Sequence, residues 1–378
     1  MAFVLQKDSH ESKGILIIKH LEYKYLESLS RRKLQELSKR YFIGLYFGFF
    51  TTRKSDFIYV DFYVGEDGVV EIPNSVIPRL NLNGYNFQPP AFFARSVSQK
   101  KFDFVFIGDS SRRKRLKFLL RNLARAMEQE DFSVLIINRT KSANLYLLLL
   151  NFLVRKKFRN LSDAIRKKIT YIEADQSKGM LIPRDVIPFF LESSKCLIIP
   201  SLAEGAARVV AEAMSKGLSI ISYADMQGAT NNHLCDDYDM LFRTSRELES
   251  CMVNFVRNYE IKYKHNTRNV SHLFSEEVSK KKFNFFLIAN LPDFSIDESN
   301  WESIALANSL QSHNSFLPRA IPSNPRTDEC QSYDSFYRLY SYLVGQEAHV
   351  LIDFALKIKT LFRHTLDIIL QLFQKLKV

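Results

Sequence analysis

The sequence predicts an α/β protein whose central part is a doubly wound parallel sheet. Between residues 101 and 291, short apolar runs alternate with stretches of helical composition. The five runs, FVFIG, VLIIN, ITYIE, CLIIP and SIISY, begin at positions 104, 134, 169, 196 and 219. Such runs are typical of strands that a parallel sheet buries on both faces, and their alternation with helices indicates the doubly wound arrangement.

The last two runs enclose the most informative stretch, residues 195–223. A polar loop, SLAEG, begins at Ser201, and the Ala-rich segment 206–216 after it is expected to be a helix. A strand–helix–strand unit of this kind is right-handed, and its ligands bind at the carboxyl ends of the strands. The loop that contains Glu204 is therefore the expected ligand edge, and Glu212 lies about two turns into the helix.

The spacing of these two glutamates allows both to reach one ligand. Glu204 precedes the helix N-terminus, where free N–H groups and the helix dipole favour anions, and Glu212 would reach hydroxyl groups from the side. A nucleotide sugar, which carries a diphosphate and many hydroxyls, suits this arrangement. From the spacing alone, a surface helix with solvated glutamates is the alternative.

The stretch PSLAEGAARVVAEAMSKGLSII resembles the C-terminal signature of retaining GT-B glycosyltransferases, above all glycosyltransferase family 4. That signature reads P-S-x-x-E-G, six variable residues, then E-A-M-A-x-G-x-P-V-I. The departures are Ala206-Ala207, Ser215 and Ser219, and none of them removes a charged ligand.

The resemblance implies a GT-B-like fold with a Rossmann-type donor domain. It also implies that Glu204 faces the hydroxyls of the donor sugar and that Glu212 holds the ribose. Ser201 and Gly205 match the donor-binding loop of the family. The resemblance covers roughly residues 101 to 275.

A basic turn follows the first strand of the predicted sheet. Gly108 permits close backbone approach, and four consecutive cations, from Arg112 to Arg115, precede the expected helix 116–127. Cations at a helix start oppose the helix dipole unless an anion such as a diphosphate lies between them. A solvated basic face is the alternative.

This turn also resembles the family, in which a Gly-Arg pair and a following lysine bind the donor diphosphate. Lys114 occupies the lysine position. Asp109 stands where the arginine belongs, and Arg113 or Arg112 is a candidate replacement. In a second departure, Asn138-Arg139-Thr140 takes the place of the family's Gly-rich turn.

Two further polar groups have alternative interpretations. Arg208 either faces the phosphates or forms an ion pair with Glu212, four residues on. The run 236–239 contains an Asp-x-Asp pair that could hold a divalent cation, but its position favours a solvated turn. We therefore expect no metal site and no cofactor, because Lys114 and the helix N-terminus can neutralise the diphosphate of the donor substrate.

The chain of 378 residues is long enough for two domains. We expect a reduced N-terminal α/β domain at 1–100, a Rossmann-like donor domain at 101–290 and a helical C-terminal extension at 291–378. A GT-B enzyme usually has an acceptor domain about as large as its donor domain, so the N-terminal part is short by comparison.

Within the N-terminal part, the pattern predicts strands at 15–18 and 57–64 and a basic helix at 28–41. The turn-rich stretch 72–90 predicts an irregular connection. The boundary with the donor domain is expected near Gln99.

The net charge of +12 indicates acidic partners: nucleic acid, an anionic membrane or phosphorylated small molecules. No nucleic-acid-binding motif is present, so nucleic acid is not an expected partner. Scattered cysteines without metal-site spacing predict a reduced, cytoplasmic protein. The longest apolar runs, 41–50 and 145–154, are about half of the ~20 residues that span a bilayer.

The C-terminal stretch 350–378 has apolar residues at helical spacing with lysines and arginines between them. It predicts an amphipathic helix that either packs on the core or lies on the inner face of a membrane. The second interpretation would suit a lipid-linked acceptor.

The resemblance to this family therefore implies a metal-independent glycosyltransferase that moves a sugar, with retention, from a nucleotide-diphosphate sugar to a glycan or lipid-linked acceptor. Glu204 and Lys114 are the expected catalytic residues. Two features, the short N-terminal part and Asp109, favour an alternative: a non-catalytic nucleotide-sugar-binding or scaffold subunit of a glycan-assembly complex.

Overall fold

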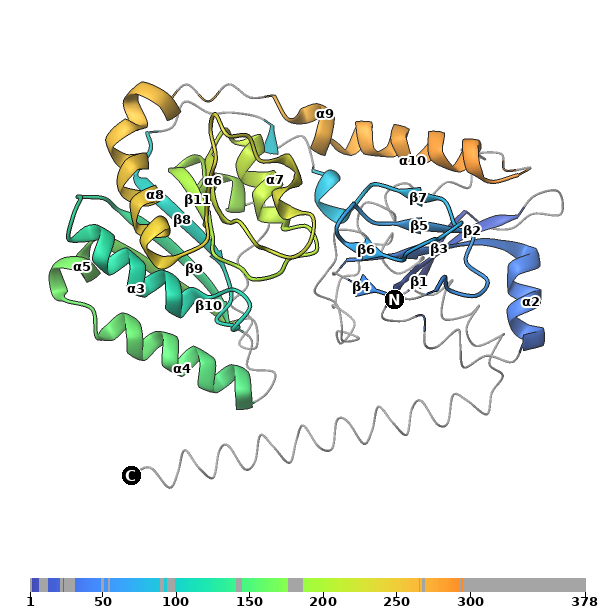
Figure 1. The fold of residues 1–378 in the computed structure, drawn as a ribbon, viewed down its shortest axis with the longest axis horizontal. Coiled ribbons are helices and arrows are strands. Elements are labelled where there is room, and N and C mark those ends of the chain that lie inside the picture. The colour runs from blue at the N-terminus through green and yellow to red at the C-terminus, as the bar shows by residue number, and fades with distance from the viewer. Residues whose placement is uncertain are drawn as a thin grey trace.

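In a computed structural model, the described residues form two large β-sheets, each with helices packed on it, and one separate pair of short strands (Figure 1). The structure describes residues 2–6, 13–20, 23, 31–48, 51–53, 55–88, 92–93, 99–140, 145–175, 186–264, 266, 269–292 and 294. The predicted C-terminal helix at 350–378 lies outside the described residues.

The second sheet has the strand order β10-β9-β8-β11-β12-β13, and all neighbouring strands are parallel. Its strands are β8 (Phe102–Gly108), β9 (Val134–Thr140), β10 (Ile169–Asp175), β11 (Ser194–Ile199), β12 (Ser219–Tyr223) and β13 (Met240–Phe242). The five predicted apolar runs lie in the first five strands, except that Pro200 of the run CLIIP follows the end of β11. Because the strand order reverses between β8 and β11, the carboxyl ends of these two strands form the crevice in which such sheets bind ligands.

Helices cover both faces of this sheet, which confirms the doubly wound prediction. One face packs against α3 (Leu116–Met127), α4 (Leu145–Arg159) and α8 (Ser245–Asn258), and the other packs against α6 (Ile187–Glu192) and α7 (Arg208–Ser215). The shorter elements α5 (Asp163–Lys167) and η6 (Thr230–His233) lie between these helices in the chain, and the π-helical turn η7 (Tyr259–Tyr263) follows α8.

The first sheet has the order β1-β2-β3-β5-β7, with β1 antiparallel to β2 and the other pairs parallel. Its strands are β1 (Ala2–Gln6), β2 (Gly14–Lys19), β3 (Tyr41–Tyr46), β5 (Phe62–Val64) and β7 (Arg79–Leu80). A separate parallel pair is formed by β4 (Thr51–Thr52) and β6 (Val70–Glu71), and the 3-10 turn η2 (Gly84–Asn86) follows β7.

Several boundaries differ from the sequence prediction. The strand expected over 57–64 begins only at Phe62, because Tyr59 has a positive φ of 58° in a turn. Helix α2 (Arg31–Arg40) ends before Tyr41, which opens the buried strand β3. Helix α7 begins two residues later than expected, because Ala207 is extended (φ −73°, ψ 104°). Helix α3 has the predicted bounds.

After the second sheet the chain returns to the first. Helix α9 (Ser271–Phe274) leads into α10 (Glu276–Asn290), which lies over the first sheet (Figure 1). Phe283 and Leu287 of α10 are fully buried in one cluster with Phe62 of β5, and the Phe62 and Phe283 rings lie 6.4 Å apart. The hydrophobic core of the first sheet is therefore completed by residues that follow the second sheet.

Among the described helices, none combines the length and the apolar composition needed to cross a bilayer.

Phe283→Ala is expected to lower the free energy of unfolding by about 3–5 kcal/mol, because it removes a fully buried ring from the core of the first sheet. Phe285, two residues along α10, is 75% exposed, so Phe285→Ala is the matched control with a change within about 0.5 kcal/mol. Urea unfolding checks both values. Equal losses would show that α10 does not pack as described.

A second prediction concerns pH. His20 stacks on Phe47 with ring centroids 5.2 Å apart, and burial lowers the pKa of its imidazole to about 4, although a backbone hydrogen bond with Tyr46 acts in the opposite direction. The unfolded chain takes up this proton near pH 6.5, and the folded chain does so only near pH 4. The free energy of unfolding is therefore expected to fall by roughly 3 kcal/mol as the pH is lowered from about 6.5 to about 4.

Urea midpoints between pH 7 and pH 4 test this loss. His20→Gln should flatten the slope over that window, whereas the exposed His272→Gln should leave it unchanged. An identical slope in the parent and in His20→Gln would contradict the assignment.

Candidate functional site

Two loops meet at the carboxyl edge of the second sheet. The turn after β8 carries Lys114, and the loop after β11 carries Glu204; β8 and β11 are hydrogen-bonded neighbours. The backbone N–H of Leu202 donates to the carbonyl of Arg113 at 2.9 Å, which joins the loops directly. The strand order therefore brings together residues that lie ninety positions apart in the chain.

Lys114 and Glu204 form a close ion pair in this crevice. Their Nζ and Oε1 atoms are 2.5 Å apart, and their side chains are only 12% and 7% exposed. The carboxylate oxygen Oε1 is buried, so the Lys114 ammonium is the cation that balances its charge. Arg113 lies further out, with a guanidinium nitrogen 3.9 Å from Glu204 Oε2.

The loop after β12 fixes the position of Glu204. The Glu204 N–H donates to the carbonyl of Gln227 at 2.8 Å, and the N–H of Ala229 donates to the carbonyl of Gly205 at 2.8 Å. Gly228 between them has φ 102°, and a Cβ there would lie 1.7 Å from the carbonyl oxygen of Glu204. Only glycine fits this contact. The sequence did not predict this role of Gly228, whose only signal is that it is a lone glycine shortly after a predicted strand.

The beginning of α7 completes this edge. Thr230 Oγ1 accepts from the N–H of Ala207 at 3.1 Å, whereas the N–H groups of Gly205 and Ala206 donate to no described residue. Unpaired N–H groups beside a helix start favour an anion. Glu212 lies within α7 and is 6% exposed.

The remaining predicted residues also lie on these elements. Ser201 is buried at the end of β11, Gly108 ends β8, and Arg208 is the first residue of α7. Their roles in binding, and the two alternatives for Arg208, stay predictions.

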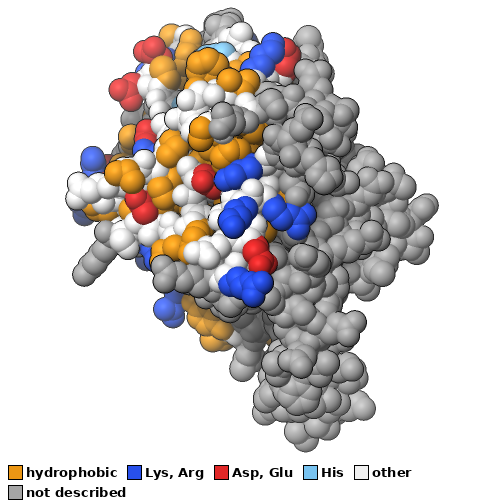
Figure 2. Space-filling view, turned by 90° about the vertical axis from the view of Figure 1, so that its right-hand side faces the viewer, with side chains coloured by type: hydrophobic (Ala, Val, Ile, Leu, Met, Phe, Trp, Pro, Cys, Tyr) orange, Lys and Arg blue, Asp and Glu red, His pale blue; other side chains and the backbone are white. Residues whose placement is uncertain are grey.

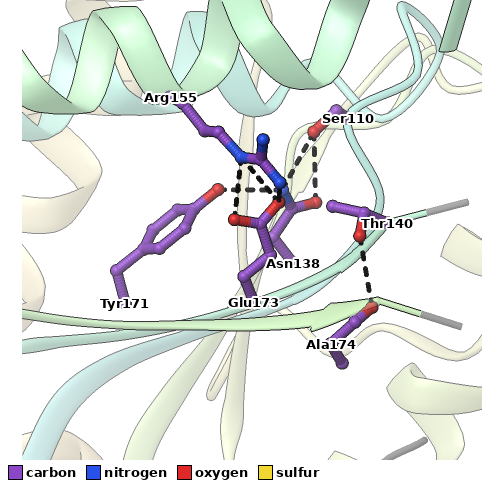
Figure 3. Close-up of polar contacts among 7 residues, drawn as sticks. All are labelled: Ser110, Asn138, Thr140, Arg155, Tyr171, Glu173 and Ala174. Atoms are coloured by element: carbon purple, nitrogen blue, oxygen red, sulfur yellow. Dashed lines mark hydrogen bonds and ion pairs between the residues drawn. The ribbon is translucent and has the colours of Figure 1, made fainter. Parts of the chain in front are cut away.

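Asp109 and Asn138, which depart from the pattern of the resembled family, both form hydrogen bonds that hold nearby chain segments. Asp109 Oδ1 accepts from the Ser111 N–H at 2.9 Å and so holds the basic turn in shape. Asn138, where the family has its Gly-rich turn, is fully buried and its amide nitrogen donates to Ser110 at 3.0 Å and to Tyr171 at 2.8 Å (Figure 3). Burial raises the pKa of Tyr171 to about 12, so its hydroxyl stays protonated.

The Asp-x-Asp run is part of a turn. Asp239 is buried, and its two oxygens accept from the backbone N–H groups of Ile220 at 2.8 Å and Cys235 at 2.9 Å. Asp236 and Asp237 are exposed. This turn caps the start of β12, which gives Asp239 a structural role.

A buried polar cluster links the first sheet to the loop that holds Glu204. The Glu66 carboxylate accepts a hydrogen bond from Tyr85, and His233 Nε2 lies 3.5 Å from Glu66 Oε2. Burial and the charge of Glu66 raise the pKa of Tyr85 well above its usual value, so Tyr85 remains a donor. Asn232 Nδ2 donates to the carbonyl of Asp67 at 2.9 Å. Neither His233 nor Glu66 belongs to a motif, and the sequence predicted no role for either.

The architecture is a GT-B-like fold, as predicted: two α/β sheets with parallel strands, of which the second is Rossmann-like, in the arrangement of solved GT-B glycosyltransferases. No protein-family model and no curated protein matches the sequence.

Solved structures resemble the chain at low sequence identity. A variant of S. aureus TarM, in complex with fondaparinux, alpha-GlcNAc-glycerol and UDP, has a TM-score of 0.51 and 10% identity over 71% of this chain and 55% of that chain. TarM itself gives 0.50 and 11% over 72% and 54%. Anabaena HepE with UDP-glucose gives 0.48 and 11% over 71% and 78%. The chain spans about half the length of the TarM and GtfA/B structures. This likeness establishes the fold alone.

Gly228→Ala is expected to displace the Glu204 loop, because the new Cβ would overlap the Glu204 carbonyl and φ 102° is unfavourable for alanine. We expect the fold to persist with the Lys114–Glu204 pair broken. Gly68→Ala is the matched control, since Gly68 also has a positive φ of 83° but its Cβ would meet nothing closer than 3.6 Å.

Hydrogen exchange of the 201–207 backbone measures the effect. Exchange should rise there in Gly228→Ala and stay unchanged in Gly68→Ala. Equal protection of this loop in both variants would show that Gly228 does not fix it.

Proposed function

We propose that this protein transfers a sugar from a nucleotide-diphosphate sugar, with retention of configuration and without a metal cofactor. The observation that carries the proposal is the buried Lys114–Glu204 pair in the crevice between β8 and β11. A cation and a carboxylate meet there beside the N–H groups that precede α7. These groups match the phosphate and the sugar hydroxyls of one donor molecule.

The two members of the pair have different tasks when a donor binds. Lys114 exchanges part of its contact with Glu204 for the diphosphate, and the N–H groups of Gly205 and Ala206 add hydrogen bonds to the same anion. Both stabilise the negative charge that grows on the leaving diphosphate. Glu204 Oε1 is then available to accept from a sugar hydroxyl.

The other predicted residues bind the donor around this centre. Glu212 would hold the ribose hydroxyls from α7. Gly108 and Ser201 let the ligand approach the strand ends, and Arg113 and Arg208 add positive charge. The acceptor is a glycan or a lipid-linked molecule on the side of the first sheet, and the protein acts in the cytoplasm.

The second candidate is a nucleotide-sugar-binding subunit that does not catalyse transfer. Asp109 favours it, because this residue shapes the turn where the resembled family has a phosphate-binding arginine, so the clamp has one cation fewer. This candidate predicts donor binding without turnover.

A thermal-shift screen with UDP-, GDP- and ADP-sugars tests binding, because a ligand that prefers the native state raises Tm. Release of the nucleoside diphosphate then tests turnover. Lys114→Ala and Glu204→Gln are expected to lower turnover about 10²–10³-fold, the usual cost of losing one group that stabilises transition-state charge. Lys117→Ala, an exposed cation on α3, is the control and should stay near the parent rate.

The outcomes separate the candidates. A Tm rise with a donor but no diphosphate release would favour the binding subunit. No Tm rise with any donor would refute both.

A further inference from the structure

Helix α4 leaves most of its apolar residues in contact with solvent. It is a peripheral helix beside the second sheet (Figure 1) and reads LYLLLLNFLVRKKFR. Of its described side chains, only Asn151 and Val154 are buried. Tyr146, Leu149 and Phe152 are 48%, 53% and 57% exposed and recur every three residues, so they form one stripe along the helix.

The C-terminal half of α4 anchors this stripe to the sheet. Arg155 donates three hydrogen bonds of 2.7 to 3.0 Å to the Glu173 carboxylate of β10 (Figure 3). Phe158 stacks on Tyr171 with ring centroids 4.7 Å apart, and these four side chains with Arg159 line a cavity of about 280 Å³. The exposed stripe is thus a fixed surface of the folded protein.

The charged residues of α4 itself are all basic. Helix α4 contains four cations, Arg155, Lys156, Lys157 and Arg159, and no acidic residue. Glu173 of β10 pairs with Arg155. At the other end of the helix, the guanidinium of Arg112 lies 5.8 Å from the Tyr146 ring. A partner of this surface must therefore accept apolar side chains and carry negative charge.

We propose that α4 docks on an anionic lipid surface. A helix of 15 residues is about 22 Å long, too short to cross a bilayer but suited to lie along it, with Tyr146, Leu149 and Phe152 among the acyl chains and the cations at the headgroups. Each lysine or arginine near such a surface adds attraction to anionic lipid.

Two other partners for the stripe, the segment 351–378 and a second copy of α4, are disfavoured because they carry positive charge themselves. The segment 351–378 of this chain has five Lys and Arg residues against two Asp, so it would bring like charge to α4. A second copy of α4 would do the same. An anionic lipid surface is complementary to both the stripe and the cations.

Two other helices show that exposed apolar side chains alone, or positive charge alone, do not distinguish α4. On α10, Phe285 and Ile288 are 75% and 58% exposed, but two of its three lysines, Lys280 and Lys281, pair with glutamates one turn earlier. Helix α2 is basic but has no exposed large apolar side chain among its described residues. The end of the molecule that carries the first sheet shows basic and acidic side chains close together (Figure 2). Helix α4 combines an apolar stripe with unbalanced positive charge.

The docking surface adjoins the candidate donor site, because Arg112 belongs to the turn that carries Lys114. A membrane at α4 would present a lipid-linked acceptor near this turn. The placement of an acceptor near this turn rests on the proposed function, whereas the docking of α4 on lipid does not.

The test is cosedimentation of the full chain with vesicles. We expect binding to an equal mixture of phosphatidylcholine and phosphatidylglycerol, at least about tenfold weaker binding to phosphatidylcholine alone, and loss of binding at high salt. Leu149→Glu with Phe152→Glu should weaken binding to the mixed vesicles at least about tenfold, because two apolar contacts with the acyl region are lost. Lys156→Glu with Arg159→Glu should weaken it to a similar extent.

Two matched controls accompany these variants. Phe285→Glu on α10 and Lys39→Glu with Arg40→Glu on α2 should bind the mixed vesicles like the parent. Circular dichroism confirms that each variant is folded. The donor thermal shift should be the same in the α4 variants as in the parent, so failure of lipid docking is distinguishable from failure of the proposed function.

The proposal is overturned if the parent chain does not bind the mixed vesicles, or binds both vesicle types equally. It is also overturned if the α2 variant loses binding while the α4 variants keep it. A change from oligomer to monomer on Leu149→Glu with Phe152→Glu, seen by light scattering, would identify the stripe as an interface between protein chains instead.

Discussion

The contact between Lys114 and Glu204 is the constraint on which the candidate site depends. Both charges are nearly excluded from water, and a buried ion pair contributes little net stability, whereas loss of one partner leaves a costly unpaired charge. The pair therefore requires that both loops stay in place. Its position follows from the strand order, because β8 and β11 are parallel neighbours and their following loops therefore meet at one edge of the sheet.

The environment of the pair extends into the first sheet. Gly228 lets the loop after β12 approach Glu204, and the same stretch of chain continues to His233, which faces Glu66. Helix α10 then carries the chain back over the first sheet, where Phe283 is buried. The loop that positions Glu204 is therefore in contact with both sheets.

The departures from the family pattern show how a turn can keep its shape with different residues. Asp109 replaces a positive charge, yet its carboxylate organises the turn through the Ser111 N–H. Asn138 lies in the stretch that stands where the resembled family has a Gly-rich turn, and its amide links Ser110 to Tyr171. The turn that carries Lys114 is thus held by a carboxylate and a backbone N–H.

Sequence alone determined five strands of the second sheet, the bounds of α3 and the position of Glu204 in a loop just before a helix. Apolar runs, helix-forming residues and turn residues act locally, so a short stretch of sequence is enough to recognise them. It missed β3, whose continuous apolar run has no alternation, and it placed α7 too early, since Ala-rich composition does not reveal the bond from Ala207 to Thr230. The ion pair, the role of Gly228, the burial of Glu66 and the exposure of α4 were decided by tertiary structure. Each depends on which distant segments pack together, and local preference carries no information about that.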